Sequence, residues 1–257
     1  SQWLGMGRQL LSEEPVFRAA LEACDRAIEA EAGFSLLGEL SADEAASQLG
    51  RIDVVQPVLF AIEVGLAALW RSWGVEPDVV VGHSMGEVAA AHVAGALRLE
   101  DAVAIICRRS RLLRRISGQG EMAVVELSLA EAEQALSGYE ARLSVAVSNS
   151  PRSTVLSGEP AALGQVLVAL EAKGVFCRRV KVDVASHSPQ VEPLREELVA
   201  ALAELQPRQG AVPMRSTVTG ALVSGAELDA GYWADNVRQP VRFAEAVQAL
   251  AESGHAL

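Results

Sequence analysis

Cysteine is scarce in this 257-residue chain. Its three cysteines, Cys24, Cys107 and Cys177, lie far apart and form no Cys-x-x-Cys pair. An odd, scattered set of this kind argues against a disulfide framework and against a zinc site, and it favours a reducing cytoplasm. No apolar run reaches the ~20 residues that cross a bilayer, and the first residues lack the layout of a signal peptide. We therefore expect a cytoplasmic protein with no membrane partner.

Positive charge is also in short supply. The chain has 22 Lys and Arg residues against 33 Asp and Glu residues, which gives a formal net charge of −11. Such a charge repels a phosphate backbone, so nucleic acid is not expected as a partner. Hydrophobic residues make up 50% of the chain, and a chain of this length buries roughly 70–75% of its unfolded surface. One large domain, with or without a small insertion, is expected.

Two amphipathic helices are predicted in the first third of the chain. Phe17, Leu21, Cys24 and Ile28 recur at the spacing of one helical face. Pro57 is predicted to open a second helical pattern, because proline is favoured in the first turn of a helix. Further helices are expected over about 99–115, 193–205 and 245–253.

A strand, a tight turn and a helix are predicted in direct succession after residue 77. The β-branched run at 78–81 (Asp-Val-Val-Val) ends at Gly82. An alanine-rich helical segment follows from Glu87 to about Ala96. This succession is typical of an α/β protein.

The middle of the chain predicts a small α+β unit in the order βαββαβ, the ferredoxin-like arrangement. In its last strand Val180, Val182 and Val184 alternate with polar residues, so one side is expected to pack and the other to face water. Strands are expected at 122–127, 143–147, 154–157 and 176–184, and helices at 129–136 and 161–172. We therefore predict a ferredoxin-like subdomain at 118–185, inserted into an α/β-hydrolase-like catalytic domain at 1–117 and 186–257.

Residues 82–86 (Gly-His-Ser-Met-Gly) fit the pattern G-x-S-x-G at the predicted turn. The two glycines lack the Cβ atoms that would clash in so sharp a turn, so Ser84 Oγ is expected to project over the edge of the sheet. The helix that begins near Met85 would point backbone N–H groups at an oxyanion formed there. This context predicts a nucleophilic serine, and the alternative is an ordinary glycine-rich turn.

A serine nucleophile needs a base, and the chain has four histidines. His83 adjoins Ser84 in an extended segment, where successive side chains point apart, while His92 lies in the following helix and His255 in a tail. His187 closes the predicted insertion and re-enters the main body, where a loop residue can reach a cleft. The spacing leaves His187 open equally to the role of base and to that of a capping or surface residue.

Arg109 is predicted to lie in an apolar stripe. Its neighbours one helical turn away are Ile105, Ile106, Leu112 and Leu113. An arginine keeps its charge, so one that faces inward needs an anion. That anion is either an internal Asp or Glu in a structural ion pair or a carboxylate brought by a substrate.

Seven short motifs occur along the chain in a fixed order and resemble the acyltransferase domain of modular or iterative polyketide synthases. The resemblance covers essentially the whole chain, and malonyl-CoA:acyl carrier protein transacylases of fatty-acid synthesis are similar more distantly. The motifs are Ser1-Gln2-Trp3-Leu4-Gly5-Met6-Gly7, Gln56-Pro57, Gly82-His83-Ser84-Met85-Gly86-Glu87, Arg108-Arg109-Ser110-Arg111, Asn149-Ser150-Pro151, Val184-Ala185-Ser186-His187 and Asn236-Val237-Arg238-Gln239-Pro240-Val241.

The resemblance implies roles for the site residues. Ser84 is implied as the nucleophile that becomes acylated, His187 as its base, and Arg109 as the partner of the extender unit's free carboxylate. The Met85 N–H is implied as an oxyanion donor, and the Asn236 position matches the backbone carbonyl that orients the histidine. Further orienting or pocket positions are matched by Gln56, His83, Asn149, Val184 and Ser186.

The resemblance also implies a reaction. A malonyl or methylmalonyl unit would pass from CoA to the serine and then to the phosphopantetheine thiol of an acyl carrier protein, in a ping-pong sequence. Neighbouring synthase domains are implied as partners, and no metal or bound cofactor is implied. A buried guanidinium would admit a carboxylated acyl group and leave a neutral acetyl group unpaired. Water must be kept from the acyl-enzyme.

The choice of extender unit stays open because two positions disagree. Ser186 stands where malonyl selectors of the family often have Phe, and the extra room favours an α-methyl group. Met85 stands where malonyl selectors have an apolar residue and methylmalonyl selectors commonly have Gln. The family also carries a strand and a Gly-Gln-Gly segment before Gln2 and another strand after Leu257. We therefore expect this chain to be a segment of a longer polypeptide, trimmed at both ends.

Two other functions stay open. A serine esterase or thioesterase shares the G-x-S-x-G turn but transfers the acyl group to water, and it has no need of a cation at Arg109. A catalytically silent docking module of a megasynthase is the alternative of a different class.

Overall fold

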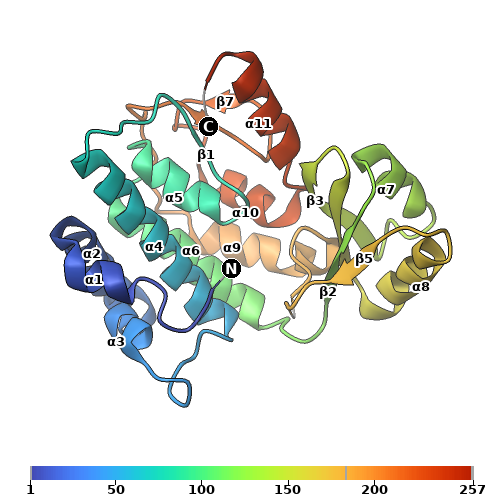
Figure 1. Ribbon diagram of the computed structural model, residues 1–257, viewed down its shortest axis with the longest axis horizontal. Coiled ribbons are helices and arrows are strands. Elements are labelled where there is room, and N and C mark those ends of the chain that lie inside the picture. Colours follow the sequence, from blue (N-terminus) through green and yellow to red (C-terminus); the bar gives the residue numbers. More distant parts are fainter. Residues whose placement is uncertain (1, 183, 256–257) are drawn as a thin grey trace.

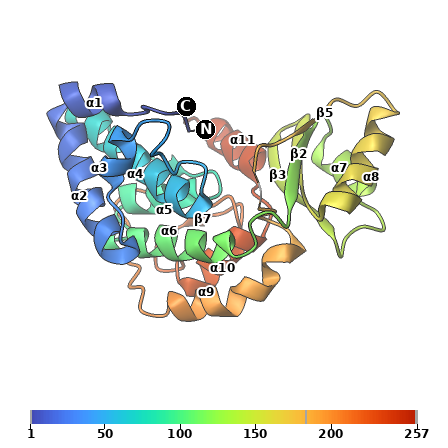
Figure 2. The ribbon, with the colours of Figure 1, turned by 90° about the horizontal axis from the view of Figure 1, so that it is seen from below.

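The computed structural model describes residues 2–182 and 184–255. Two bodies are visible in Figure 1: a larger, mostly helical one built from both ends of the chain, and a smaller one built from its middle. Figure 2 shows the smaller body projecting from one side of the larger one. This is the predicted combination of an α/β body with a ferredoxin-like subdomain, and the relatives described below share it.

The larger body packs helices around a short mixed sheet. Its strands are β1 (Val80–Val81), β6 (Met214–Arg215) and β7 (Leu222–Val223). They lie in the order β1-β6-β7, with β1 parallel to β6 and β6 antiparallel to β7. Its helices are α1 (Arg8–Glu13), α2 (Pro15–Ala32), α3 (Leu36–Ser41), α4 (Ile52–Ser72), α5 (Gly86–Val93), α6 (Leu99–Arg114), α9 (Arg195–Ala201), α10 (Ala230–Arg238) and α11 (Phe243–Glu252), with a 3₁₀ segment at Pro189–Leu194.

Helices α2, α4 and α6 pack on one another and form most of the core beneath the short sheet. The predicted apolar face of α2 is confirmed, since Phe17, Leu21, Cys24 and Ile28 are all fully buried. Gly65 lets α2 approach α4 closely, because a Cβ at that position would lie 2.4 Å from Leu21 Cδ1. These helices hold α6, which carries Arg109, in a rigid setting.

The start of α4 differs from the prediction, because the helix begins at Ile52 and contains Pro57. The proline has no N–H for the Asp53 carbonyl, but Val54 already lies on the buried face with Val58. Burial of this extra turn therefore extends the helix past the proline. By length and composition α4 could cross a membrane, with a mean hydropathy of 1.8, but here it packs against α2, α5 and α6.

The smaller body is a four-stranded antiparallel sheet in the order β3-β4-β2-β5. Apolar residues from one sheet face pack against α7 and α8, and α7 starts at a capping box formed by Ser128 and Glu131. The elements are β2 (Glu121–Val125), α7 (Leu129–Ala135), β3 (Leu143–Ser150), β4 (Ser153–Gly158), α8 (Pro160–Glu171) and β5 (Cys177–Arg179).

The last strand of this sheet is shorter than predicted, and its expected packed side is wrong. β5 pairs only with β2, from Cys177 to Arg179, and the Val180 N–H still donates to Met122 O at 2.8 Å. The chain then leaves the sheet edge, so Val180 is 37% exposed and Val182 44% exposed. Only Val184 is buried, and it lies in the core of the larger body. Asp183, expected on the polar side, lies outside the described residues.

The other face of the small sheet rests on the larger body. Val147 and Val155 form a small apolar cluster with Val241, which precedes α11. A parallel bridge joins Val147 to Val241, and the Val241 N–H donates to Ala146 O at 2.8 Å. The sheet is therefore fixed to the same segment of chain that follows α10.

Candidate active site

The turn between β1 and α5 holds Ser84 in a strained backbone conformation. Its φ is 54°, in the left-handed region that residues with a side chain rarely adopt. Gly82 makes the turn possible, because a Cβ there would lie 2.2 Å from Glu87 N. The prediction that Gly86 must also lack a Cβ is wrong. Among the described residues, a Cβ at Gly86 would meet only the Glu63 carboxylate, at 3.8 Å, which is an ordinary contact distance.

Ser84 and His187 are hydrogen-bonded through their side chains. Ser84 Oγ lies 2.8 Å from His187 Nε2, and His187 Nδ1 lies 2.8 Å from Gln239 O. A carbonyl oxygen only accepts, so Nδ1 carries the ring proton and the Nε2 lone pair faces the serine hydroxyl. The two side chains have the geometry of a nucleophile and a general base.

The backbone carbonyl that binds His187 Nδ1 belongs to Gln239. The prediction that this carbonyl lies at the Asn236 position is wrong. α10 ends at Arg238, and Pro240 has no N–H to donate back to the carbonyls at this helix end. Those carbonyls bind His187 instead, and Val237 O accepts from its backbone N–H at 2.9 Å. Asn236 belongs to the site through its side chain, whose Oδ1 accepts from Arg109 Nη1.

His187 is buried where the chain returns from the small sheet. It is 2% exposed, and its φ of 60° is also left-handed. Burial, followed by the positive charge of Arg109, lowers the pKa of its imidazole to about 3. The ring is therefore neutral at pH 7 and free to accept a proton.

Arg109 is buried, and no carboxylate of the described residues forms an ion pair with it. It is 2% exposed on α6, its Nη1 donates to Asn236 Oδ1 at 2.6 Å, and its Nε is buried without a hydrogen-bond partner. No ion pair within the described ranges includes Arg109, so the alternative of an internal ion pair is not realised. Burial lowers the pKa of its guanidinium to about 10, and the group stays charged at neutral pH.

Glu87 is a buried acid to which the sequence analysis assigned no role. It lies in the first turn of α5 and is fully buried. Its carboxylate accepts from Asn236 Nδ2 at 2.9 Å, from Tyr232 OH at 2.7 Å and from the Thr217 backbone N–H at 2.5 Å. Burial raises the pKa of Glu87, and these donors oppose that effect. Acidic residues are common in the first turn of a helix, because they interact favourably with the helix dipole. The position of Glu87 in the sequence therefore did not indicate that its side chain is buried.

Met85 follows Ser84 directly and is the N-cap of α5. The next three backbone N–H groups, from Gly86 to Val88, donate to the carbonyls of residues 83 to 85. The Met85 N–H precedes this series and belongs to the helix end whose N–H groups lack intrahelical acceptors. It is thus available to a negative charge that forms on a group attached to Ser84.

His83 and Asn149 join the two bodies beside the turn. His83 Nε2 lies 2.9 Å from Asn149 Oδ1, near the end of β3. The His83 ring also packs on Phe243, with 5.1 Å between ring centroids. Although His83 adjoins Ser84 in sequence, it is engaged with the small sheet.

Three other predicted residues have no hydrogen bond to Ser84 or His187 among the described contacts. Gln56, on α4, has its Oε1 buried without a partner. Val184 is 2% exposed, and the Ser186 backbone oxygen accepts from Ser157 Oγ of β4 at 2.7 Å. Val184 and Ser186 thus fix the segment that leads into His187.

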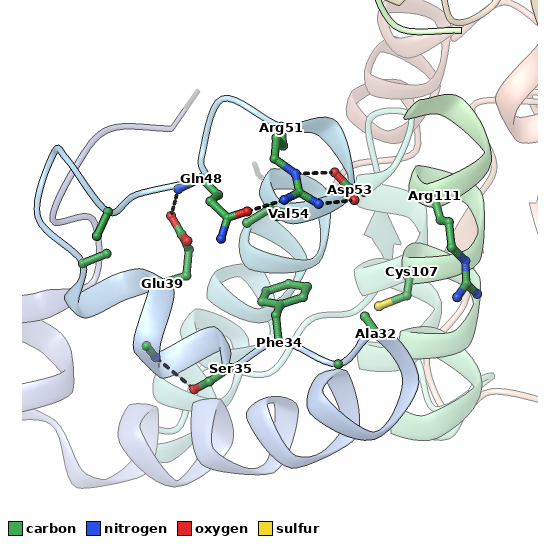
Figure 3. A pocket seen from close by; sticks show the side chains of 14 residues that line it. Ala32, Phe34, Ser35, Glu39, Gln48, Arg51, Asp53, Val54, Cys107 and Arg111 are labelled. Atoms are coloured by element: carbon green, nitrogen blue, oxygen red, sulfur yellow. Dashed lines mark hydrogen bonds and ion pairs between the residues drawn. The ribbon is translucent and has the colours of Figure 1, made fainter. Parts of the chain in front are cut away.

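A polar cavity separate from this cluster lies between the ends of α2, α3, α4 and α6 (Figure 3). Its volume is about 560 Å³, and none of the predicted site residues lines it. Arg51 is bound there to Asp53 and Gln48, and Glu39 accepts from Gln48 N at 2.8 Å. Among the described residues, no group of three or more His, Cys, Asp or Glu side chains could hold a metal ion.

Comparison with known proteins gives relatives along the whole chain. The chain is 51% identical over 255 residues to erythronolide synthase EryA2 of Saccharopolyspora erythraea, covering 99% of this chain and 7% of that protein. It is 50% identical over 256 residues to the spectinabilin polyketide synthase system protein NorC of Streptomyces orinoci, covering 99% of this chain and 11% of that protein. The chain therefore spans about a tenth or less of these relatives.

Solved structures show the same fold. The acyltransferase domain from module 8 of the salinomycin polyketide synthase matches with a TM-score of 0.97 and 45% identity, over 100% of this chain and 60% of that one. The malonyl CoA-acyl carrier protein transacylase of Coxiella burnetii matches with a TM-score of 0.89 and 26% identity, over 99% of this chain and 81% of that one. A family model described as the acyl transferase domain matches residues 1–257. The chain belongs to the acyl transferase domain family and is an acyltransferase domain of the polyketide synthase type.

Proposed function

We propose that this domain moves a malonyl or methylmalonyl unit from CoA to the phosphopantetheine thiol of an acyl carrier protein, in polyketide biosynthesis in the cytoplasm. The observation that carries the proposal is the hydrogen bond of 2.8 Å between Ser84 Oγ and His187 Nε2, beside a buried arginine that forms no ion pair with any acid in residues 2–182 and 184–255. Membership of the acyl transferase domain family supports acyl transfer, and the chemistry of the site supports the particular acyl group.

In the first half-reaction, Ser84 Oγ attacks the thioester carbonyl of the acyl-CoA. His187 Nε2 takes the serine proton as the new C–O bond forms, and Gln239 O holds the resulting imidazolium through Nδ1. The Met85 N–H and the N-terminal end of α5 stabilise the oxyanion. When the C–S bond breaks, the imidazolium gives its proton to the departing sulfur, and an ester on Ser84 remains.

In the second half-reaction, the thiol of the carrier's phosphopantetheine replaces CoA. His187 Nε2 takes the thiol proton, sulfur attacks the Ser84 ester, and the proton returns to Ser84 Oγ as the C–O bond breaks. The sequence is ping-pong, because CoA leaves before the carrier reacts. It uses the side chains described above and requires no bound metal or redox cofactor, and neighbouring synthase domains would bring the carrier to the site.

Arg109 supports a carboxylated acyl group. Its charge is buried, and its Nε finds no hydrogen-bond acceptor in the part of the chain that the structure describes. A guanidinium in such a setting pairs well with a carboxylate through parallel hydrogen bonds. A malonyl or methylmalonyl group brings that carboxylate, whereas an acetyl group leaves Arg109 without a partner.

Intact-mass measurement after mixing with malonyl-CoA or methylmalonyl-CoA tests the function and separates it from its rivals. Transfer predicts a persistent adduct of one acyl group, which disappears in Ser84→Ala and is passed on when a carrier protein is added. A thioesterase would release free acid and accumulate no adduct. Absence of both adduct and free acid would indicate a silent docking module and would contradict the proposal.

A further inference from the structure

We propose that Glu87 is a positioning residue that fixes the direction of the Asn236 amide and, through that amide, the orientation of the Arg109 guanidinium. The inference rests on the proposed function, because it takes Arg109 to bind a substrate carboxylate. It adds a residue that does not itself contact the acyl group and that decides how the acyl group is recognised.

The three side chains form one buried line between three helices. Glu87 on α5 is fully buried, Asn236 on α10 is 1% exposed and Arg109 on α6 is 2% exposed. Asn236 stands in the middle: its Nδ2 donates to Glu87 Oε2 at 2.9 Å, and its Oδ1 accepts from Arg109 Nη1 at 2.6 Å. No ion pair of 4.0 Å or less between Glu87 and Arg109 occurs in the described part of the chain, so the opposite charges act through the amide.

The ends of the Asn236 amide are not equivalent, and Glu87 decides which end faces Arg109. A carboxylate only accepts hydrogen bonds, so it turns the NH₂ end of the amide towards itself. The oxygen end then faces the guanidinium, which only donates. With the amide reversed, N–H groups would face N–H groups on the arginine side and oxygen would face oxygen on the other.

The other partners of Glu87 show that its carboxylate is the acceptor throughout. Its Oε1 accepts from the Thr217 backbone N–H at 2.5 Å. Ser216 Oγ accepts from two backbone N–H groups at 3.0 and 3.1 Å, so its own proton points to Tyr232 OH, 2.7 Å away. Tyr232 therefore donates its proton to Glu87 Oε2 at 2.7 Å. A protonated Glu87 would add a hydrogen to a site already filled by donors.

Two consequences follow for the acyl site. First, Asn236 occupies Nη1 of Arg109 while Nε stays unpaired, so a different edge of the guanidinium is left for a carboxylate. Second, Asn236 Nδ2 also lies 3.1 Å from the Ser84 backbone oxygen. Loss of the link to Arg109 should weaken only carboxylated acyl groups, whereas loss of the link to Ser84 should affect every acyl group alike.

The test compares a carboxylated ligand with a neutral one in the Ser84→Ala background, where no acyl-enzyme forms. Dissociation constants of malonyl-CoA and acetyl-CoA are measured by calorimetry with and without Glu87→Gln. Gln keeps the size of the side chain but presents an amide donor to groups that all donate. We expect malonyl-CoA affinity to fall about 10- to 100-fold more than acetyl-CoA affinity, as for a lost hydrogen bond to a charged group. A turned amide also loses its link to the backbone oxygen of residue 84, and that loss is common to both ligands.

Two further variants sharpen the comparison. Glu87→Asp keeps a carboxylate and is expected to restore part of the preference for malonyl-CoA, which a purely space-filling role would not do. Glu63→Gln is the matched control, because it makes the same change in a carboxylate that lies beside Gly86. None of the described hydrogen bonds that link Glu87, Asn236 and Arg109 involves Glu63. Glu63→Gln is expected to leave the ratio of the two affinities unchanged.

An unchanged ratio in a folded Glu87→Gln protein would overturn the inference. If that variant does not fold, Asn236→Asp tests the inference instead, because Asp has nearly the same shape as Asn. Its carboxylate would pair directly with Arg109 and be repelled by Glu87, so the preference for malonyl-CoA should disappear. Retention of the preference in folded Asn236→Asp would also overturn the inference.

A crystal structure of ligand-free Glu87→Gln separates this inference from the proposed function. We expect the Asn236 amide to turn and the contact between Arg109 Nη1 and Asn236 Oδ1 to be lost. If this is seen while Ser84 of the unsubstituted chain takes no acyl group, the proposed function fails and the positioning role stands. If Ser84 is acylated but Arg109 keeps its place in the variant, the positioning role fails alone.

Discussion

The residues that form the candidate site differ in how far their sequence context reveals them. Ser84 lies in a local pattern, G-x-S-x-G after a β-branched run, and the backbone confirms the sharp turn that this pattern predicts. His187 and Arg109 were found by their surroundings and by resemblance. Glu87 and Gln239 were missed as site residues, because their positions depend on contacts between α5, α6, α10 and the segment that contains His187. No spacing along the chain encodes such contacts.

Removal of the Arg109 cation is expected to abolish the preference for carboxylated acyl groups. Arg109→Met retains apolar bulk in the buried site and removes the charge, so kcat/KM for malonyl-CoA should fall about 10- to 100-fold while that for acetyl-CoA stays within about threefold. Arg111→Ala is the control, since that side chain is 60% exposed on the same helix. An unaltered preference for malonyl-CoA in Arg109→Met would contradict the assignment.

Burial of His187 should make the protein less stable as the pH falls. Its imidazole has a pKa of about 3 in the folded protein and 6.5 as a free side chain. Between these values the unfolded chain binds a proton that the folded chain does not, so stability rises with pH and is lost on acidification. His187→Gln should reduce the fall in the free energy of unfolding between about pH 7.5 and about pH 5, by up to about 1.4 kcal/mol per pH unit below 6.5.

Urea unfolding of both proteins at the two pH values measures this contribution. The comparison between proteins cancels the titration of groups that they share. Equal pH dependence in the two proteins would show that the imidazole is not held neutral by burial.

At the scale of elements, the long periodic segments were predictable and the short strands were not. The face of α2 follows from helical spacing alone, because four apolar residues lie on one side. The alternation of Val180, Val182 and Val184 predicted a longer β5, but a strand exists only where a neighbour pairs with it, and β2 provides partners only up to the bond with Val180. Pro57 predicted too late a start for α4. The helix begins before the proline, at Ile52, because Val54 is buried.

The crossing of α2 and α4 supplies a prediction about a single glycine. Gly65→Ala places a Cβ 2.4 Å from Leu21 Cδ1, and such overpacking costs about 1–3 kcal/mol. The gain in helix propensity, about 1 kcal/mol, offsets part of that loss. We expect the free energy of unfolding to fall by up to about 2 kcal/mol.

Gly164→Ala on α8 is the matched control in the same urea experiment. Among the described residues, its added Cβ would have one neighbour within 4 Å, Arg179 Nη2 at 3.5 Å, which is the end of a flexible side chain. The variant should therefore gain up to about 1 kcal/mol from helix propensity. A Gly65→Ala protein as stable as Gly164→Ala would mean that α2 and α4 do not pack as described.

At the scale of the whole molecule, the order of strands and helices predicted both bodies. The boundaries at 118 and 185 stay predictions; the small sheet itself runs from Glu121 to Arg179. The way in which the sheet rests on the larger body was not predicted, because the cluster of Val147, Val155 and Val241 joins segments that are far apart along the chain. The small sheet also contacts the segment that carries His187, because Ser157 Oγ of β4 donates to Ser186 O at 2.7 Å.

This arrangement predicts that two similar core substitutions in the small body differ in their effect on acylation. Val155→Ala removes bulk from the sheet face against the larger body, and Val166→Ala removes it from α8, which packs on the opposite face of the sheet. Both should lower the free energy of unfolding by roughly 1–3 kcal/mol. Only Val155→Ala should slow acylation of Ser84, by at least about threefold, because it disturbs the placement of the segment that carries His187.

Single-turnover intact-mass kinetics, at a temperature where both variants are folded, measure this difference. Equal rates in the two variants would show that docking of the small sheet does not govern the distance between the two reacting side chains. Slow acylation in both would point to a loss of overall stability instead.

The balance of charge between Arg109 and Glu87 bears on how the product departs. A bare guanidinium in a dry cavity would retain a malonyl group tightly, even after the group had moved from Ser84 to the carrier's sulfur. Here an opposite charge stands one amide away, and Asn236 already occupies Nη1. If the proposed function holds, we expect this nearby charge to weaken the hold of Arg109 on the malonyl carboxylate, which would favour dissociation of the loaded carrier.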